Sequence, residues 1–489
     1  MEITATTRSC ARRSKSSAGE KTGARRRCTP FGERFRWAHS GTLLGVQARW
    51  KGRGGAVSHP ICHPGCCIAA VLATALIGTQ VEEAAAQPVG PVLSLAKKEK
   101  PALLDTLKEL VSIETGSRDL EGLDRAAKLI AARLSALGGK VELVDPSEGA
   151  YRMEDTPARI GKIVHARFEG KGTKKILLLA HMDTVYLRGM LAKQPFRIDG
   201  NRAYGLGISD DKQGVALILH TLAMLKAMDF RGYGLVTALI NADEEISSPG
   251  SRHLLTRLGA EHDAVFSFES SRVDSDKLAL ATSGIASVIL KVKGRASHAG
   301  ASPEQGRNAL YEAAHQILQT RDLSDPATGL KMNWTLISAG TNRNVIPANA
   351  VATADVRVLR VSDYDGIERA VRERIRNRLI PDTQVEMVFE RRRPPLEATP
   401  AARALGDHAR RIYAEIGKNL VVDALAEGGG TDAAFASLNT KAPVLERFGL
   451  QGYGAHANDA EYIAVDSIEP RLYLLARLIM DVSQGKDRQ

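Results

Sequence analysis

Hydrophobic positions repeat along most of this chain with two alternating spacings. Continuous apolar runs of strand length occur at 176–180, 235–241, 264–268 and 443–445, and a further strand is predicted at 140–144. Helical spacing marks 101–113, 123–137, 214–228, 401–416 and 470–483. Continuous apolar strands are typical of parallel sheets that have helices on both faces. The pattern therefore predicts an α/β domain with a mostly parallel sheet.

A second pattern interrupts this domain between residues 283 and 397. Strands are predicted at 288–292, 332–338, 351–358 and 385–389, and helices at 308–318 and 364–379. The resulting β-α-β-β-α-β order is that of a ferredoxin-like module. We therefore expect a larger domain in two parts, 100–282 and 398–489, with a ferredoxin-like domain inserted at 283–397. Residues 88–100 are predicted to form a linker between the N-terminal leader and the larger domain.

The leader, residues 1–87, differs in composition from the rest of the chain. It contains 13 Lys and Arg, 5 Asp and Glu and all five cysteines, whereas the remaining 402 residues carry 54 Lys and Arg, 51 Asp and Glu and no cysteine. Most of the net charge of +11 therefore lies in the leader. The near-neutral body gives no electrostatic footprint for nucleic acid. A zinc knuckle at 62–67 is not expected, because no second ligand pair follows at finger spacing.

Residues 61–86 have the pattern of a secretory signal. The apolar segment at 68–77 is too short to span a membrane, and the small residues Ala84-Ala85-Ala86 follow it as a cleavage site. We therefore expect a periplasmic or secreted protein with no stable membrane insertion after processing. The basic stretch upstream is far longer than a signal n-region. Translation is accordingly expected to start nearer Val46, with a disordered basic tail as the alternative.

Histidines and carboxylates follow the predicted strands and turns of the larger domain. The positions are His181 with Asp183, Asp210-Asp211, Glu244-Glu245, Glu269 and His456. Each has an ordinary alternative: a structural histidine, a helix cap, a solvated pair, an arginine partner or a loop histidine bonded to backbone. Because parallel strands present their carboxyl ends at one edge of a sheet, we expect these side chains to meet there.

Two histidines and three carboxylates are the ligands that two adjacent zinc ions need, with one carboxylate bridging both. The remaining carboxylate of Glu244-Glu245 would then be a base. A covalent acyl-enzyme route is excluded, because the body has no cysteine and no serine in a nucleophile-elbow motif. The pattern therefore predicts metal-assisted hydrolysis.

Several motifs, in the same order, resemble those of the co-catalytic zinc peptidases. They are His181-Met-Asp-Thr-Val-Tyr, Gly207-Ile-Ser-Asp-Asp-Lys, Asp243-Glu-Glu, Ser267-Phe-Glu and Ala296-Ser-His-Ala-Gly300. That superfamily includes acetylornithine deacetylase, succinyl-diaminopimelate desuccinylase, aminoacylase and glutamate carboxypeptidase. The chain looks most like the bacterial glutamate carboxypeptidases that hydrolyse folates, from about Leu103 to Lys486.

The resemblance implies a zinc-peptidase catalytic domain with two Zn²⁺ ions per chain. Asp210 would bridge the two ions, His181 and Glu269 would complete one site, and Glu245 and His456 the other.

It also implies the roles of three further residues. Asp183 would orient His181, and Glu244 would be the general base. His298, on the inserted dimerisation domain, would reach across a homodimer to help hold the oxyanion. A histidine that only stabilises its own turn is the alternative for His298.

Three positions match those that contact the substrate carboxylate in the family: Asn344, Arg357 and Arg393. A guanidinium is well suited to a bidentate grip on a carboxylate. Arg391 and Arg392 leave open which member of the triplet makes the contact, and three consecutive arginines are otherwise typical of solvated surface.

The sequence departs from the family at Ala426-Glu427, Gln213 and Ser270-Ser271. None of these changes removes a proposed ligand, but the first affects the specificity pocket. The predicted function is zinc-dependent hydrolysis of the amide bond to a C-terminal amino acid, with glutamate favoured, on a small peptide or N-acyl amino acid. An N-acyl-amino-acid deacylase or dipeptidase of the same superfamily is the first alternative, and a non-catalytic dimeric binding protein the second.

Overall fold

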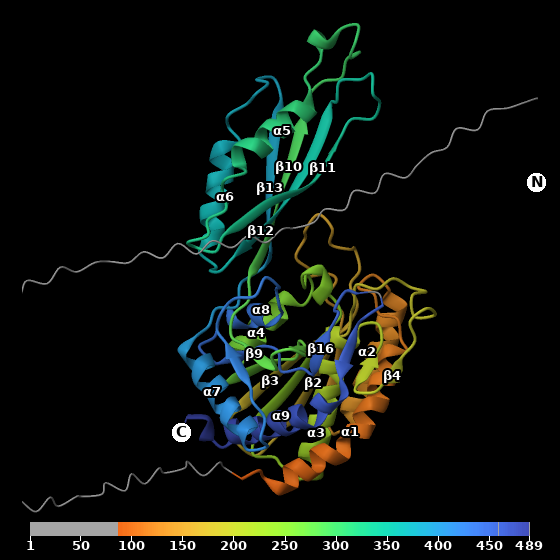
Figure 1. The fold of residues 1–489 in the computed structure, drawn as a ribbon, viewed down its shortest axis with the longest axis vertical. Coiled ribbons are helices and arrows are strands. Elements are labelled where there is room, and N and C mark those ends of the chain that lie inside the picture. The colour runs from red at the N-terminus through yellow and green to blue at the C-terminus, as the bar shows by residue number, and fades with distance from the viewer. Residues whose placement is uncertain (1–86, 458, 489) are drawn as a thin grey trace, which may run out of the picture. The chain divides into compact units, whose positions relative to one another are not determined.

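Six strands form the central sheet of the larger domain, in the order β1-β2-β6-β3-β7-β15. Figure 1 labels β2 and β3 of this sheet. They are β1 (Lys140–Val144), β2 (Ile163–Glu169), β3 (Lys175–His181), β6 (Leu235–Asn241), β7 (Ala264–Ser267) and β15 (Val444–Leu445). Strands β6, β3, β7 and β15 are parallel, and β2 runs against both its neighbours. The predicted mostly parallel sheet is confirmed, and β2 is the strand that the prediction missed.

The computed structural model describes residues 87–488 except residue 458. The predicted signal segment at 61–86 therefore lies outside the described residues.

Alternate side chains of β3 enter two different cores, which explains its continuous apolar sequence. Ile176 and Leu178 pack against the helices of one face, and Leu177 and Leu179 against those of the other. All four side chains are at most 1% exposed. The first face carries α1 (Gly90–Val111), α2 (Leu120–Ala136), α3 (Gln213–Ala227), α7 (Pro400–Ala414) and α9 (Ile468–Ser483). The second carries α4 (Arg252–Glu261) and α8 (Ala433–Ser437).

Helix α1 begins at Gly90, so the prediction of a linker at 88–100 is wrong. A proline stands in its first turn, where its missing N–H leaves no bond unmade, and Pro101 lies inside the helix. An interior proline costs about 3 kcal/mol or more. Burial of Val92, Ala96, Leu103 and Leu107 in the main core offsets that cost.

Two small sheets hold the loops around the carboxyl edge of the central sheet. One contains β4 (Arg197–Asp199), β5 (Arg202–Tyr204), β17 (Tyr462–Ala464), β16 (Gln451–Tyr453) and β8 (Ser271–Arg272). The other pairs β14 (Val421–Asp423) with β9 (Lys277–Ala279) in parallel. Strands of two or three residues carry too little periodicity to be predicted.

The inserted domain has the predicted ferredoxin-like order. Its elements are β10 (Gly284–Lys293), α5 (Ala309–Thr320), β11 (Lys331–Ala339), β12 (Asn349–Val358), α6 (Asp363–Arg374) and β13 (Gln384–Arg393). The four strands form an antiparallel sheet in the order β11-β12-β10-β13. Val288 and Leu290 of the sheet pack with Ile367 and Val371 of α6. The fold-class prediction is thus confirmed for both domains.

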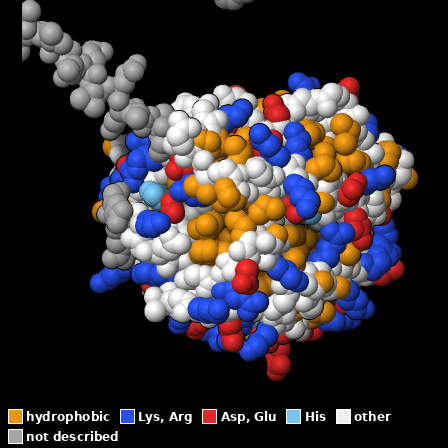
Figure 2. Space-filling model, turned by 90° about the horizontal axis from the view of Figure 1, so that it is seen from below, with side chains coloured by type: hydrophobic (Ala, Val, Ile, Leu, Met, Phe, Trp, Pro, Cys, Tyr) orange, Lys and Arg blue, Asp and Glu red, His pale blue; other side chains and the backbone are white. Residues whose placement is uncertain are grey.

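Charges of both signs are mixed on the face shown in Figure 2, around a centre of apolar side chains. This mixture agrees with the near-neutral composition of the body. Within residues 87–488, no helix that the structure describes is long and apolar enough to cross a membrane.

Candidate metal centre

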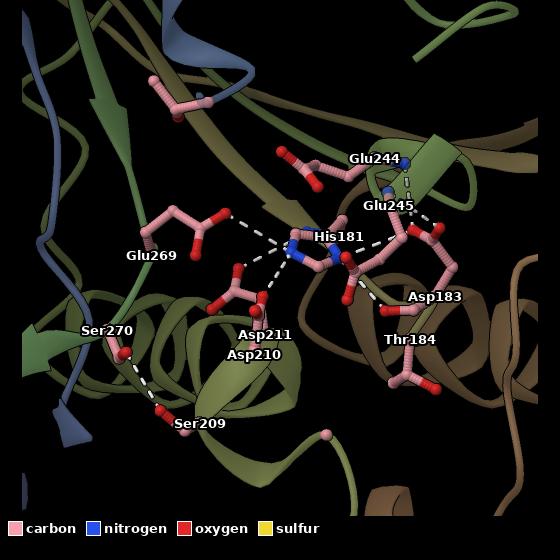
Figure 3. Close-up of polar contacts among 12 residues, drawn as sticks. His181, Asp183, Thr184, Ser209, Asp210, Asp211, Glu244, Glu245, Glu269 and Ser270 are labelled. Atoms are coloured by element: carbon pink, nitrogen blue, oxygen red, sulfur yellow. Dashed lines mark hydrogen bonds and ion pairs between the residues drawn. The ribbon is translucent and has the colours of Figure 1, made fainter. Parts of the chain in front are cut away.

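The five predicted ligands meet at the carboxyl edge of the central sheet. Figure 3 shows His181, Asp210, Glu245 and Glu269 of this set. His181 is the last residue of β3, and Glu269 follows the end of β7 by two residues. Asp210 lies in the turn Ile208–Lys212 before α3, and Glu245 in a single helical turn after β6. His456 lies in the loop after β16. Segments far apart in sequence thus supply one cluster.

Asp210 presents one carboxylate oxygen to each histidine. Its Oδ1 is 3.0 Å from Nε2 of His181, and its Oδ2 is 3.3 Å from Nε2 of His456. Glu269 Oε1 is 3.4 Å from His181 Nε2, and Glu245 Oε2 is 3.1 Å from His456 Nε2. The donor atoms of each trio lie within 4.8 Å of one another. This is the arrangement that a carboxylate shared between two cations requires.

The donor set fits divalent cations. Imidazole and carboxylate are ligands that Zn²⁺ accepts. Glu245 Oε1 is buried and has no hydrogen-bond partner among the residues that the structure describes. Such an atom costs about 1–3 kcal/mol or more if it stays unpaired, and a cation would satisfy it.

Asp183 fixes the orientation of His181. Its carboxylate is fully buried and accepts hydrogen bonds from the backbone N–H groups of Glu244 and Glu245, both 3.1 Å, and from Ser117 Oγ, 2.8 Å. His181 Nδ1 is 3.4 Å from Asp183 Oδ1 and 3.1 Å from its carbonyl oxygen. With Nδ1 engaged, Nε2 is the nitrogen left for a cation.

Glu461 is a residue of this site that the sequence analysis missed. Its carboxylate accepts hydrogen bonds from the backbone N–H groups of Gly207 (2.9 Å), Ser209 (2.7 Å) and Asp210 (3.1 Å), and from Tyr186 Oη (2.5 Å). It therefore holds the turn that carries Asp210. An acidic residue in a loop gives no local signal of such a role, because its partners lie far earlier in the sequence. Asp210, for example, lies 251 positions before Glu461.

Glu244 lies beside the cluster and is paired with Arg393. Arg393 Nη2 is 2.9 Å from Glu244 Oε1 and also donates to the Glu244 carbonyl oxygen at 2.6 Å. Arg393 Nη1 donates to Asp432 Oδ1 at 2.9 Å. Only Arg393 of the arginine triplet lines the cavity that contains the cluster. Arg391 pairs with Asp365 and Glu368, and Arg392 with Asp155 and Glu390.

The electrostatics of the cluster favour added positive charge. Burial raises the pKa of Glu244 well above its ordinary value, although Arg393 opposes the shift. Burial, reinforced by Asp210, raises the pKa of Glu245 to about 7. Hydrogen bonds to Asp210 and Glu245 raise the pKa of His456 to about 11. Without a bound metal ion, protonated histidines thus supply the positive charge that the carboxylates attract.

Besides Arg393, the residues predicted on the inserted domain to contact the substrate carboxylate or the oxyanion fall into two groups. Arg357 lines the same cavity of about 370 Å³, and its Nε is 2.8 Å from Asp355 Oδ2. His298 and Asn344 are exposed and are not among the described residues that line this cavity. The backbone N–H of Ala299, the residue after His298, donates to the Asn344 carbonyl oxygen at 2.9 Å. His298 and Asn344 therefore lie on neighbouring segments. His298 Nδ1 accepts from the N–H groups of Gly300 and Ala301, as a turn histidine would, and Nε2 is left for another partner.

The fold and this cluster define a two-domain α/β metallohydrolase. Residues 177–481 match the model of peptidase family M20/M25/M40, and the chain belongs to that family. It is 45% identical over 421 residues to carboxypeptidase G2 of Pseudomonas sp. (strain RS-16), covering 86% of this chain and 98% of that one. It is 26% identical over 390 residues to acetylornithine deacetylase of Edwardsiella ictaluri, covering 76% and 93%. The fold is similar to that of aminopeptidase PepT from Bacillus cereus, with a TM-score of 0.63 at 19% identity over 78% and 98% of the two chains.

Proposed function

We propose that this protein is a di-zinc carboxypeptidase that hydrolyses the amide bond to a C-terminal glutamate. The observation that carries the proposal is the Asp210 carboxylate, which faces His181 with one oxygen and His456 with the other. The greater identity to carboxypeptidase G2 than to acetylornithine deacetylase, 45% against 26%, favours a carboxypeptidase over a deacylase.

His181, Asp210, Glu245, Glu269 and His456 would hold the two cations. When bound, such cations supply Lewis-acid activation of the attacking water and of the substrate carbonyl. Glu244 lines the same cavity and would act as the general base that takes a proton from the attacking water and returns it to the leaving amine. Arg393 holds the Glu244 carboxylate at 2.9 Å, so this base has a fixed position.

The C-terminal side of the substrate would occupy the cavity lined by Arg357, Arg393 and Glu244. A guanidinium such as that of Arg357 grips a carboxylate through two parallel hydrogen bonds. The Nε and Nη2 groups of Arg357 donate to the two oxygens of Asp355 at 2.8 and 3.0 Å, which fixes the guanidinium, so a substrate carboxylate would meet its remaining N–H groups.

The acyl side of the substrate would occupy a second cavity, of about 510 Å³. Glu245, one of the candidate metal ligands, also lines this second cavity. Its lining includes Val185, Leu187 and Ile246, and Leu187 is 75% exposed. An apolar wall of this kind favours an aryl over a small acyl group. Leu187→Ser should raise KM for N-aroyl-glutamates and leave KM for N-acetyl-glutamate nearly unchanged.

Neighbouring glutamates give a matched test of the mechanism. Glu244→Ala should keep two zinc ions per chain, while kcat falls by about 10²–10⁴, because the proton acceptor is lost. Glu245→Ala should instead lose zinc, because it removes a ligand of one ion. Metal content by mass spectrometry, measured with kcat, separates the two. An active Glu244→Ala enzyme would refute the assigned base.

A substrate panel tests the specificity. We expect hydrolysis of N-acyl-L-glutamates in preference to N-acetyl-L-ornithine, N-acetylated apolar amino acids and dipeptides. Equal rates across the panel would contradict the glutamate preference, and a preference for N-acetylornithine would favour the deacylase alternative.

We also propose that the protein is an exported homodimer in which His298 and Asn344 complete the partner's site. Their exposure at neighbouring positions of the inserted domain supports this arrangement. His298→Ala should keep its zinc and its dimer mass by light scattering, while kcat falls by about 10²-fold or more. A monomeric, active enzyme would overturn the assignment. N-terminal sequencing of the exported protein tests the signal, and an intact Met1 would exclude cleavage.

A further inference from the structure

One wall of the catalytic cavity carries an ion pair that the proposed mechanism does not use. Glu427 and Arg447 both line the cavity, and Arg447 Nη2 donates to Glu427 Oε2 at 2.7 Å. The other oxygen of Glu427 contacts Lys277 Nζ. Lys277 is buried behind this wall and is also 3.1 Å from Asp423 Oδ2. Two cations and two carboxylates therefore make this wall neutral.

The backbone around these side chains is fixed. The N–H of Ser283 donates to the carbonyl oxygen of Glu427 at 2.9 Å. Arg447 Nη1 donates to the carbonyl oxygen of Ser270 at 2.7 Å, next to the candidate ligand Glu269. Arg447 Nε is buried and has no hydrogen-bond partner among the described residues.

Glu427 also lies close to the proposed carboxylate grip. The next residue, Gly428, accepts a hydrogen bond from Arg357 Nη1 at 2.9 Å through its carbonyl oxygen. A substrate held at Arg357 would therefore extend along the wall that contains Glu427. A carboxylate on its side chain would meet a fixed negative charge there, beside cations that are already paired.

We propose that Glu427 is a specificity-determining residue whose carboxylate competes with an acidic substrate side chain for Arg447, the cation of this wall that lines the cavity. As a result, the protein distinguishes a C-terminal glutamate only weakly from glutamine, which has the same shape without the charge. The inference rests on the proposed function, because it requires the cavity to take the C-terminal residue of the substrate.

Glu427→Gln tests this directly, because it removes the charge and keeps the size of the side chain. KM for an N-acyl-L-glutamate should fall about tenfold, since a like-charge contact in the pocket is lost. KM for the matching N-acyl-L-glutamine should change by less than about twofold, and kcat for both by less than about threefold.

Asp423→Asn is the matched control. Asp423 also pairs with Lys277, but it is not among the described residues that line the cavity. This variant should leave the glutamate-to-glutamine ratio of kcat/KM within about twofold of the parent value. An equal gain in Asp423→Asn and Glu427→Gln would overturn the proposal, because the effect would then come from Lys277 alone.

Arg447→Gln provides a change of opposite sign. It removes a cation and leaves Glu427 less compensated, so KM for the glutamate substrate should rise while KM for the glutamine substrate stays nearly constant. This variant also keeps the proposal falsifiable if Glu427→Gln does not fold.

Binding of the free products separates this inference from the proposed function. Calorimetric titration of the metal-loaded protein with L-glutamate and L-glutamine needs no turnover. Tighter L-glutamate binding by Glu427→Gln supports the inference, even if the parent hydrolyses neither substrate and the proposed function fails. Unchanged or weaker L-glutamate binding overturns the inference, even if the parent hydrolyses both substrates.

Discussion

The two halves of the candidate metal centre differ in how the fold holds their histidines. His181 ends a central strand, its side chain is 2% exposed, and Asp183 engages its second ring nitrogen. His456 lies in a loop, its φ is 66°, and its side chain is 56% exposed. A ligand on a rigid strand is already positioned, whereas a loop ligand loses freedom when it binds. We therefore expect the His181 half to hold its ion more tightly than the His456 half.

Asp210→Ala should have the largest effect, because it removes the carboxylate that the two halves share. Both zinc ions should be lost at low micromolar free zinc, and kcat should fall by about 10⁴-fold or more. Metal analysis after gel filtration, together with kcat, checks this result. Asp274→Ala changes an exposed carboxylate outside the cluster and should retain both ions. An Asp210→Ala protein that retained two ions would exclude a bridging role.

Single-ligand variants of each half sharpen the comparison. His456→Ala should keep one tightly bound zinc ion, because the trio of His181, Asp210 and Glu269 remains intact. Glu269→Ala should lose the tighter ion and retain the one that a chelator removes more easily. A chelator titration should show two phases in the parent protein and one in each variant. Loss of the tight phase in His456→Ala would reverse the proposed order of affinity.

The strand-mounted part of the site could be predicted from the sequence because its signals are local. His181 and Glu269 each end or follow an apolar run long enough to identify a buried strand. Glu461 could not be found in the same way, because it acts on the Asp210 turn across 251 positions and belongs to no periodic pattern. The pairing of Arg393 with Glu244 was missed for the same reason.

The elements of the fold were also predictable only where their signals are local in the sequence. The ferredoxin-like order was predictable because its strands have about ten residues each, as in β10 and β12. The short strands β8, β14 and β16, which position the loops around the cavity, have two or three residues. Pairing with distant strands, and not their own sequence, makes them strands.

Glu461→Gln should have an intermediate effect on both halves, because Glu461 positions Asp210 without touching a cation. One carboxylate oxygen is lost, so at least one of the N–H groups of Gly207, Ser209 and Asp210 loses its acceptor. Zinc affinity should fall by about 10–100-fold, as for other residues that support ligands. Tyr186→Phe removes only one donor to Glu461 and should cause a smaller loss. Equal losses in competition titrations of the two variants would place the effect in Tyr186 instead.

Proton release on zinc binding should be the smallest effect, and the His456 half should contribute a separable part of it. Hydrogen bonds to Asp210 and Glu245 raise the pKa of His456 from 6.5 to about 11 in the metal-free fold. The raised pKa of His456 stabilises the metal-free fold. This stabilisation is fully present at pH values below the pKa of the unfolded state, and it is lost as pH rises through the pKa of the folded state. At about pH 8 the ring is therefore protonated and must release its proton to bind a cation.

Calorimetry at about pH 8, in buffers of different ionisation enthalpy, measures the protons released. The pKa of His181 is also raised well above its ordinary value, because Asp183, Asp210 and Glu269 outweigh the effect of burial. We therefore expect about two protons per chain in the parent and about one fewer in His456→Ala. Lower pH should weaken zinc binding by about tenfold per unit for each proton displaced. No release by the parent would mean that both rings are neutral before zinc binds, and the carboxylates would then not hold them in the protonated form.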